Sequence, residues 1–223
     1  WTIYWFMFPL AICITTTASL CGIGGPARYF AMAFNCRVTG IDLTDEYIDA
    51  ANLLTQKVGL ADRVSFDCGD ATDLPYGDGA FDMAWAMNVT MNIQDRAGFY
   101  AGVRRVLKPG GRFCISEIGQ GPGGAPYYPL TWAADPTYSF LLSPDEMRVL
   151  LETSGFRILE WIDETARRKA SADGRPPAEA KTVETPLTIE ITRGADYPDR
   201  RKNSGQSAKE GRLTNVMLVA EKV

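Results

Sequence analysis

The chain has 223 residues, which is enough for one substantial hydrophobic core. Its net charge of −4 comes from interspersed charges, and no basic run could follow a phosphate backbone, which argues against nucleic acid as a partner. The absence of histidine excludes an imidazole base, a Ser–His pair and a histidine-ligated metal. The five cysteines lack the spacing of a metal or disulfide framework, so we expect no metal site and reduced thiols in a cytoplasmic protein.

Residues 1–20 form an atypical apolar segment, because no charged residue precedes Arg28. The segment approaches the length of a membrane helix, but Pro9, the threonines at 15–17 and the lack of flanking positive charge disfavour an anchor or a signal peptide. A second interpretation is a buried first strand over residues 11–18. A third is that the native N-terminus is missing or altered, which a start without Met allows.

A glycine-rich turn follows this segment. Gly22, Gly24 and Gly25 lie where a strand turns into a helix predicted over residues 27–34, and Pro26 suits the first helical turn. Glycines let a backbone pass close to a ligand, and the free N–H groups of a helix start favour a carboxylate or a phosphate. A nucleotide-like ligand is therefore one hypothesis, and a turn that binds nothing is the alternative.

The next two predicted strands both end beside a carboxylate. Asp42 closes the strand at 37–42, about twenty residues after the glycines, a spacing that brings an acidic side chain to the ribose hydroxyls of a nucleotide. The alternative role for Asp42 is to cap the next helix, for which Thr44 is the better candidate. Asp70 follows the strand at 63–68 in the same way. Both carboxylates would lie at the edge where open α/β sheets bind ligands.

Strands and helices alternate five times up to residue 118, which predicts an α/β fold with a doubly wound parallel sheet. The expected strands cover residues 11–18, 37–42, 63–68, 81–87 and 112–118, and the expected helices cover 27–34, 45–58 and 96–107. A capped helix at 143–154 and strands at 156–162 and 214–221 follow, and residues 187–192 are either a strand or a segment of a small lobe. We expect residues 1–223 to form a single domain. Residues 119–142 and 163–211 are candidate substrate-covering insertions, with ordinary surface loops as the alternative.

Six stretches occur in an order and spacing found in one known family: Gly22–Tyr29, Val38–Leu43, Gly69–Ala71, Leu74–Pro75, Phe81–Asp82 and Val106–Gly111. Together they resemble the class I S-adenosylmethionine-dependent methyltransferases, in particular the subgroup with sarcosine/dimethylglycine and sterol methyltransferases. The resemblance covers about residues 21–160. It implies a Rossmann-like, doubly wound, seven-stranded sheet that is mostly parallel with its last strand antiparallel. It also implies a monomer or homodimer that acts on a small molecule.

The resemblance implies S-adenosylmethionine as cofactor and S-adenosylhomocysteine as product. Gly22 and Gly24, with Ile23 between them, would approach the methionine part of the cofactor. Asp42 would hold the ribose hydroxyls, and Leu43 would pack on the adenine ring.

Three further positions would complete the cofactor site that the resemblance implies. Asp70 would accept a hydrogen bond from the adenine amino group, and the backbone N–H of Ala71 would reach the ring. Asn88, just after the fourth strand, would border the sulfonium and the acceptor.

The chain departs from the family pattern just before the glycine turn. Members of the family usually carry an acidic residue and a glycine where this chain has Ala18 and Leu20. The side chain of Leu20 would crowd the methionine end of the cofactor, and Ala18 offers no carboxylate to hold the loop. A non-catalytic protein with the methyltransferase fold and impaired cofactor binding is therefore the alternative.

Methyl transfer from a sulfonium mainly requires alignment and exclusion of water. A neutral amine needs no strong base, whereas an oxygen or carbon acceptor would more often need one. The chain offers four candidates for such a base: Glu117, Asp135, Tyr127 and Tyr128. Asn88 and Asn92 could orient a polar acceptor but not deprotonate it, so we favour a small amine. Three aromatic side chains could shape the pocket: Tyr128, Trp132 and Tyr138.

Overall fold

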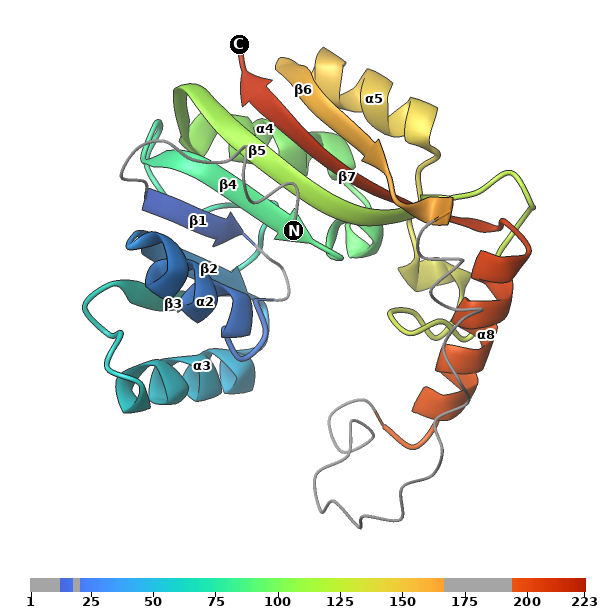
Figure 1. Cartoon of the computed structure of the whole chain (residues 1–223), viewed down its shortest axis with the longest axis horizontal. Coiled ribbons are helices and arrows are strands. Elements are labelled where there is room, and N and C mark those ends of the chain that lie inside the picture. The colour runs from blue at the N-terminus through green and yellow to red at the C-terminus, as the bar shows by residue number, and fades with distance from the viewer. Residues whose placement is uncertain (1–12, 18–20, 167–193) are drawn as a thin grey trace.

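The computed structural model describes residues 13–17, 21–166 and 194–223, the first of these by backbone alone. Ala18, Leu20 and the strand or lobe segment expected at 187–192 lie outside the described residues. Within the described part, one mixed sheet forms the centre of the fold (Figure 1). Its strands are β1 (Cys13–Thr17), β2 (Arg37–Asp42), β3 (Val64–Cys68), β4 (Phe81–Met87), β5 (Leu107–Gln120), β6 (Phe156–Asp163) and β7 (Leu213–Lys222).

The strands follow the order β3-β2-β1-β4-β5-β7-β6. The pairs from β3 to β5 are parallel, and β7 runs antiparallel to both β5 and β6. The α/β class and the mixed sheet agree with the expectation from the sequence. Strand β1 lies between β2 and β4, so residues 13–17 of the atypical apolar segment run through the middle of the sheet, as the second interpretation of that segment expected.

Helices connect the strands and cover the sheet. They are α2 (Gly25–Phe34), α3 (Asp45–Lys57), α4 (Arg96–Val106), α5 (Pro144–Thr153) and α8 (Tyr197–Lys209), with short 3-10 turns η1 (Thr90–Asn92) and η2 (Pro136–Tyr138). Helix α5 begins with the expected capping box, in which Ser143 and Glu146 bond each other's backbone. The core between helices and sheet is apolar, and Phe99, Tyr100 and Phe113 are fully buried in it with their rings about 6 Å apart.

Helix α8 is the element that the sequence pattern did not predict. Residues 196–211 read as a polar segment, and α8 indeed has little apolar surface; Ser207 is its one buried residue. Figure 1 shows α8 as an arm beyond the sheet, beside the segment that joins β5 to α5. Its polar side chains bind that segment directly. Ser207 Oγ accepts from the N–H of Tyr127 at 2.9 Å, and Ser204 Oγ accepts from the N–H of Thr131 at 3.1 Å.

Among the described residues, every helix is too short or too polar to cross a bilayer.

Two neighbouring glycines of the turn before α2 differ in what surrounds them. Gly24 is the N-cap of α2 with a φ of 76°, and a Cβ there would overlap the ring of Phe66. A Cβ on Gly25 would meet no atom within 4 Å. We expect Gly24→Ala to lower the free energy of unfolding by about 2–4 kcal/mol, because strain and overlap add. Gly25→Ala should change it by less than about 1 kcal/mol.

Urea unfolding of the two variants beside the unmodified protein measures this difference. Equal stability of the two variants would contradict the packing role of Gly24.

Candidate functional site

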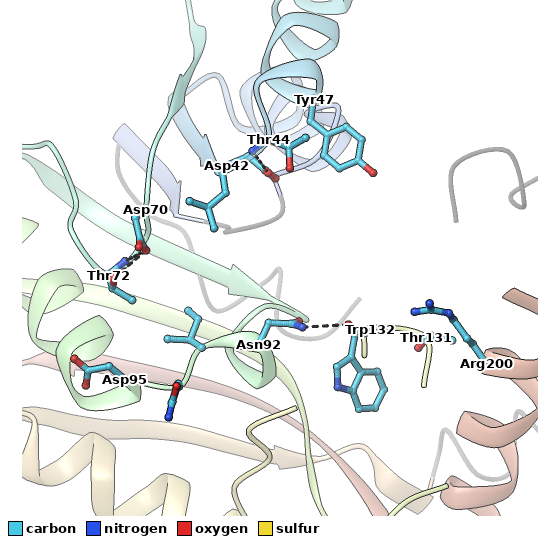
Figure 2. A pocket seen from close by; sticks show the side chains of 13 residues that line it. Asp42, Thr44, Tyr47, Asp70, Thr72, Asn92, Asp95, Thr131, Trp132 and Arg200 are labelled. Carbon is cyan, nitrogen blue, oxygen red and sulfur yellow. Dashed lines mark hydrogen bonds between the residues drawn. The ribbon is translucent and has the colours of Figure 1, made fainter. Parts of the chain in front are cut away.

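The carboxyl ends of β2 and β3 and the turn after β4 open into one cavity of about 650 Å³ (Figure 2). Its walls come from the sheet edge, from η1 and the residues after it, from residues 131–132 and from α8. The lining residues are Asp42, Leu43, Thr44, Tyr47, Asp70, Thr72, Asn92, Ile93, Gln94, Asp95, Thr131, Trp132 and Arg200. In Figure 1 the arrowheads of β1 and β4 point to the side where α8 lies. Ligands of open α/β sheets bind at this edge, beside strands whose connections leave in opposite directions.

Asp42 connects the glycine turn to the end of β2. The residue is only 1% exposed, and its two carboxylate oxygens accept from different backbone groups. Oδ2 accepts from the N–H of Gly22 at 3.0 Å, and Oδ1 accepts from the N–H of Thr44 at 3.1 Å. Thr44 is the N-cap of α3, as expected, although its side chain makes no capping bond. A carboxylate has about four acceptor positions, so Asp42 keeps room for further donors on the cavity side.

The glycine turn offers open space at one residue and tight packing at another. Gly22 has a φ of 52°, and a Cβ there would meet no atom of the described residues within 4 Å. Packing within the protein therefore requires glycine at Gly24 but not at Gly22. Arg28 braces the turn, because its Nη1 donates to the carbonyl of Ile23 at 2.7 Å and approaches Thr55 Oγ1 at 3.3 Å. Burial lowers the pKa of Arg28. The Ile23 side chain is about half exposed and does not line the cavity.

Leu43 and Asp70 both line the cavity, and each follows the end of one of the neighbouring strands β2 and β3. The Oδ1 atom of Asp70 accepts from both the N–H and the Oγ1 of Thr72 at 2.8 Å. Its Oδ2 accepts no hydrogen bond from the part of the chain that the structure describes, and it remains available to a donor. Leu43 is 60% exposed, which leaves apolar surface for a planar ring. Ala71 is buried and does not line the cavity.

The two asparagines after β4 differ in their position. Asn88 has a φ of 53°, a left-handed conformation that is uncommon outside glycine, and it does not line the cavity. Asn92 does line it, and its Nδ2 donates to the carbonyl of Trp132 at 3.2 Å (Figure 2). In both residues the buried Oδ1 has no hydrogen-bond partner among the described residues. Buried polar atoms without partners are rare, so the amide oxygen of Asn92 marks this part of the cavity wall as a place for a donor.

The structure does not bring the other two pocket candidates to the cavity. The Glu117 side chain is fully buried in an ion pair with Arg96, with 2.6 Å between Oε1 and Nη1. Burial raises the pKa of Glu117, against the opposing effect of Arg96. Tyr128 also lies outside the lining residues. The sequence pattern did not identify Arg200 as a site residue, because Arg200 lies on α8, which lacks an apolar stripe.

Comparison with known proteins agrees with this geometry. Residues 19–115 match the family model described as a methyltransferase domain. Sterol 24-C-methyltransferase ERG6B of Gibberella zeae is 37% identical over 97 residues, which are 44% of this chain and 26% of that protein. Residues 19–115 are thus similar to methyltransferase domains.

Other methyltransferases match most of this chain. The probable tocopherol O-methyltransferase of Oryza sativa subsp. japonica is 28% identical to this chain over 183 residues, which are 80% of this chain and 43% of that protein. The chain thus spans less than half the length of both curated relatives. The structure of phosphoethanolamine N-methyltransferase 2 of Haemonchus contortus with S-adenosyl-L-methionine superposes with a TM-score of 0.80 at 21% identity. It covers 99% of this chain and 51% of that one, and it shows the same fold.

Cys68 offers a chemical probe of the cavity edge. Its side chain is exposed and its Sγ lies 3.6 Å from the carbonyl of Leu43, whereas Cys21, Cys36 and Cys114 are buried. Burial raises the pKa of Cys21 and of Cys114 to about 12, so both stay protonated. A hydrogen bond to Asp45 raises the pKa of Cys68. We expect iodoacetamide to label Cys68 alone among these four, faster at pH 9 than at pH 7, because the thiolate is the reactive form.

Saturating S-adenosylhomocysteine should slow this labelling about tenfold or more if its adenosine lies between Leu43 and Asp70. Mass spectrometry of the labelled peptides measures the rate at each cysteine, with urea-unfolded protein as the control. An unchanged rate at Cys68 would argue against adenosine at this position.

Proposed function

We propose that this chain transfers a methyl group from S-adenosylmethionine to a small-molecule acceptor, and that the acceptor is an amine. One observation carries the proposal: a single cavity is lined by the carboxylates of Asp42 and Asp70 at the ends of β2 and β3 and, on its other side, by Asn92 and Trp132. The first side suits a nucleoside, and the second leaves space for a second reactant. Methyl transfer requires both reactants in one water-poor cavity.

The chain's own groups account for binding of the cofactor. Gly22 leaves space beside the turn, and the remaining acceptor positions of Asp42 suit the two ribose hydroxyls. The exposed Leu43 side chain would pack on adenine, and Asp70 Oδ2 would accept from its amino group. Bound S-adenosylmethionine supplies a methyl group on a positively charged sulfur, together with a neutral leaving group.

Two positions of the proposed cofactor site are supported more by the resemblance of the sequence to methyltransferases than by the geometry of the cavity. Ala71 would offer its backbone N–H, although its side chain is buried. Asn88 would border the sulfonium from the turn after β4, and its strained backbone and unpaired Oδ1 support a role there.

In the part of the chain that the structure describes, the carboxyl groups of Glu117 and Asp95 already have hydrogen-bond partners, which supports an amine acceptor. Glu117 is held by Arg96, and Asp95 accepts from the N–H of Gly98 at 2.9 Å as the N-cap of α4. An amine that arrives neutral needs only alignment with the sulfonium, and it loses its proton to solvent after transfer. The asparagine amide can orient such a nitrogen through its unpaired Oδ1.

The described parts of the insertions at 119–142 and 163–211 would cover the acceptor; residues 167–193 of the second insertion lie outside the described residues. Thr131 and Trp132 come from the first insertion and Arg200 from the second, and all three line the cavity. A cytoplasmic, single-domain protein belongs to the same proposal, supported by the free thiols of the described cysteines.

Removing the charge of Asp42 tests the cofactor site. We expect Asp42→Asn to raise the Kd for S-adenosylmethionine about 10- to 100-fold, because charge-assisted hydrogen bonds to the ribose weaken and the turn loses its anchor. Asp82→Asn is the matched control, since Asp82 pairs with Lys108 at 2.8 Å outside the cavity. Calorimetric titration measures both affinities, and urea unfolding shows whether each variant is folded. Equal affinity of a folded Asp42→Asn variant would remove Asp42 from the site.

The alternative function, a methyltransferase fold that does not bind its cofactor, is favoured by Ala18 and Leu20 in the sequence. We expect the unmodified chain to bind S-adenosylhomocysteine with a micromolar Kd. A chain that fails to bind, together with recovery of binding in an Ala18→Asp, Leu20→Gly double variant, would establish the alternative.

Transfer of labelled methyl to small amines, with a phenol of similar size for comparison, then identifies the acceptor class.

A further inference from the structure

The charges that line the cavity are unevenly distributed. Three carboxylates contribute to its wall, from Asp42, Asp70 and Asp95, and among the described lining residues Arg200 is the one cation. Figure 2 shows Arg200 on the opposite side from Asp42 and Asp70, next to Thr131 and beyond Trp132. The cavity therefore has an acidic side, where the cofactor is proposed to bind, and a single guanidinium on the side left for the acceptor.

The guanidinium of Arg200 is held by one ion pair, and its other N–H groups are available to a ligand. Its Nε donates to Oδ2 of Asp196 at 2.7 Å, and its side chain is 22% exposed. Arginine has five N–H donors in a planar fork, and the two terminal nitrogens of Arg200 donate to no group in the part of the chain that the structure describes. A fixed fork with free terminal donors suits the two oxygens of a carboxylate or a phosphate.

The position of Arg200 relative to the cavity is fixed by the contacts of α8. Asn203, Ser204 and Ser207 lie three, four and seven residues after Arg200, on one face of the helix, and all three bind the backbone of residues 127–131. Arg201 and Lys202 are exposed and do not line the cavity. One basic residue of this run of three is therefore directed to the cavity by the helix itself.

We propose that Arg200 binds an anionic group of the acceptor, so that the acceptor is a small molecule carrying both an amine and a carboxylate or phosphate. This inference rests on the proposed function, because it concerns the acceptor side of the same cavity. Arg200 holds the anion at α8, and the amine of the same molecule lies near Asn92, toward the sulfonium. The distance between Arg200 and Asn92 then selects acceptors by their length. An amine without an anionic group lacks the contact with Arg200 that fixes its orientation.

Three probes of equal length test this assignment on the full chain: 3-aminopropanoate, 2-aminoethylphosphonate and the neutral 3-aminopropan-1-ol. They share one amine and differ only in the group at the other end. With labelled S-adenosylmethionine, we expect kcat/KM at least about tenfold higher for one or both anionic probes than for the neutral one. The two anionic arms distinguish a carboxylate site from a phosphate site.

Variants of α8 assign the preference to one side chain. Arg200→Met should lower kcat/KM for the preferred anionic probe about 10- to 100-fold, mainly through KM, and leave the neutral probe unchanged. Arg200→Lys keeps the charge without the planar fork, so its kcat/KM for that probe should lie between those of the unmodified chain and Arg200→Met. It also replaces Arg200→Met in the comparison if Arg200→Met does not fold. Arg201→Met is the matched control and should behave as the unmodified chain does.

Binding of S-adenosylhomocysteine separates failure of this inference from failure of the proposed function. Loss of that binding in the unmodified chain would overturn both. Intact binding with equal activity on all three probes, with activity on none, or with an equal loss on all probes in Arg200→Met, would overturn the role of Arg200 and leave the cofactor site standing.

Discussion

The buried carboxylate of Asp42 is the interaction on which the cavity depends. A carboxylate that is 1% exposed would be costly without donors, and two backbone N–H groups supply them. One donor belongs to the turn before α2 and the other to the N-cap of α3, so a single side chain places two helix starts around the end of β2. The positive ends of both helices then stabilise the negative charge that holds them.

The sequence predicts this part of the molecule well because its signals are local. Strands β2 and β4 have the bounds expected from their apolar runs, and the position of Asp42 and Asp70 follows from where such strands end. Helix α8 had no such signal, because its packing face consists of hydroxyl and amide groups rather than apolar side chains. Arg200 was missed with it. Apolar periodicity identifies helices that pack on a hydrophobic core. It does not identify a helix such as α8, whose side chains bind backbone N–H and carbonyl groups.

Glu117 shows a different limit of sequence reasoning. Its residue type made it a candidate base, but its role depends on Arg96, which lies 21 residues away in the chain and pairs with it out of contact with water. Arg96 also donates to the carbonyl of Phe140 at 3.1 Å, and the N–H of Phe140 donates to the carbonyl of Met91 at 2.7 Å. The pair therefore ties the segment before α5 to η1, beside Asn92. Breaking such a pair typically costs about 3–5 kcal/mol, which makes Glu117 a support of the cavity wall.

Different interactions hold the two sides of the cavity in place. The side proposed for the cofactor comes from residues up to 115, held by the sheet, by buried apolar side chains and by Asp42. The other side comes from residues 131–132 and from α8, whose three side-chain bonds to residues 127–131 contribute about 1 kcal/mol each. Substitutions on α8 can therefore reshape the side proposed for the acceptor without disturbing the sheet. The same division explains why the family match identifies the methyl donor, while the acceptor has to be inferred from the charges that α8 brings to the cavity.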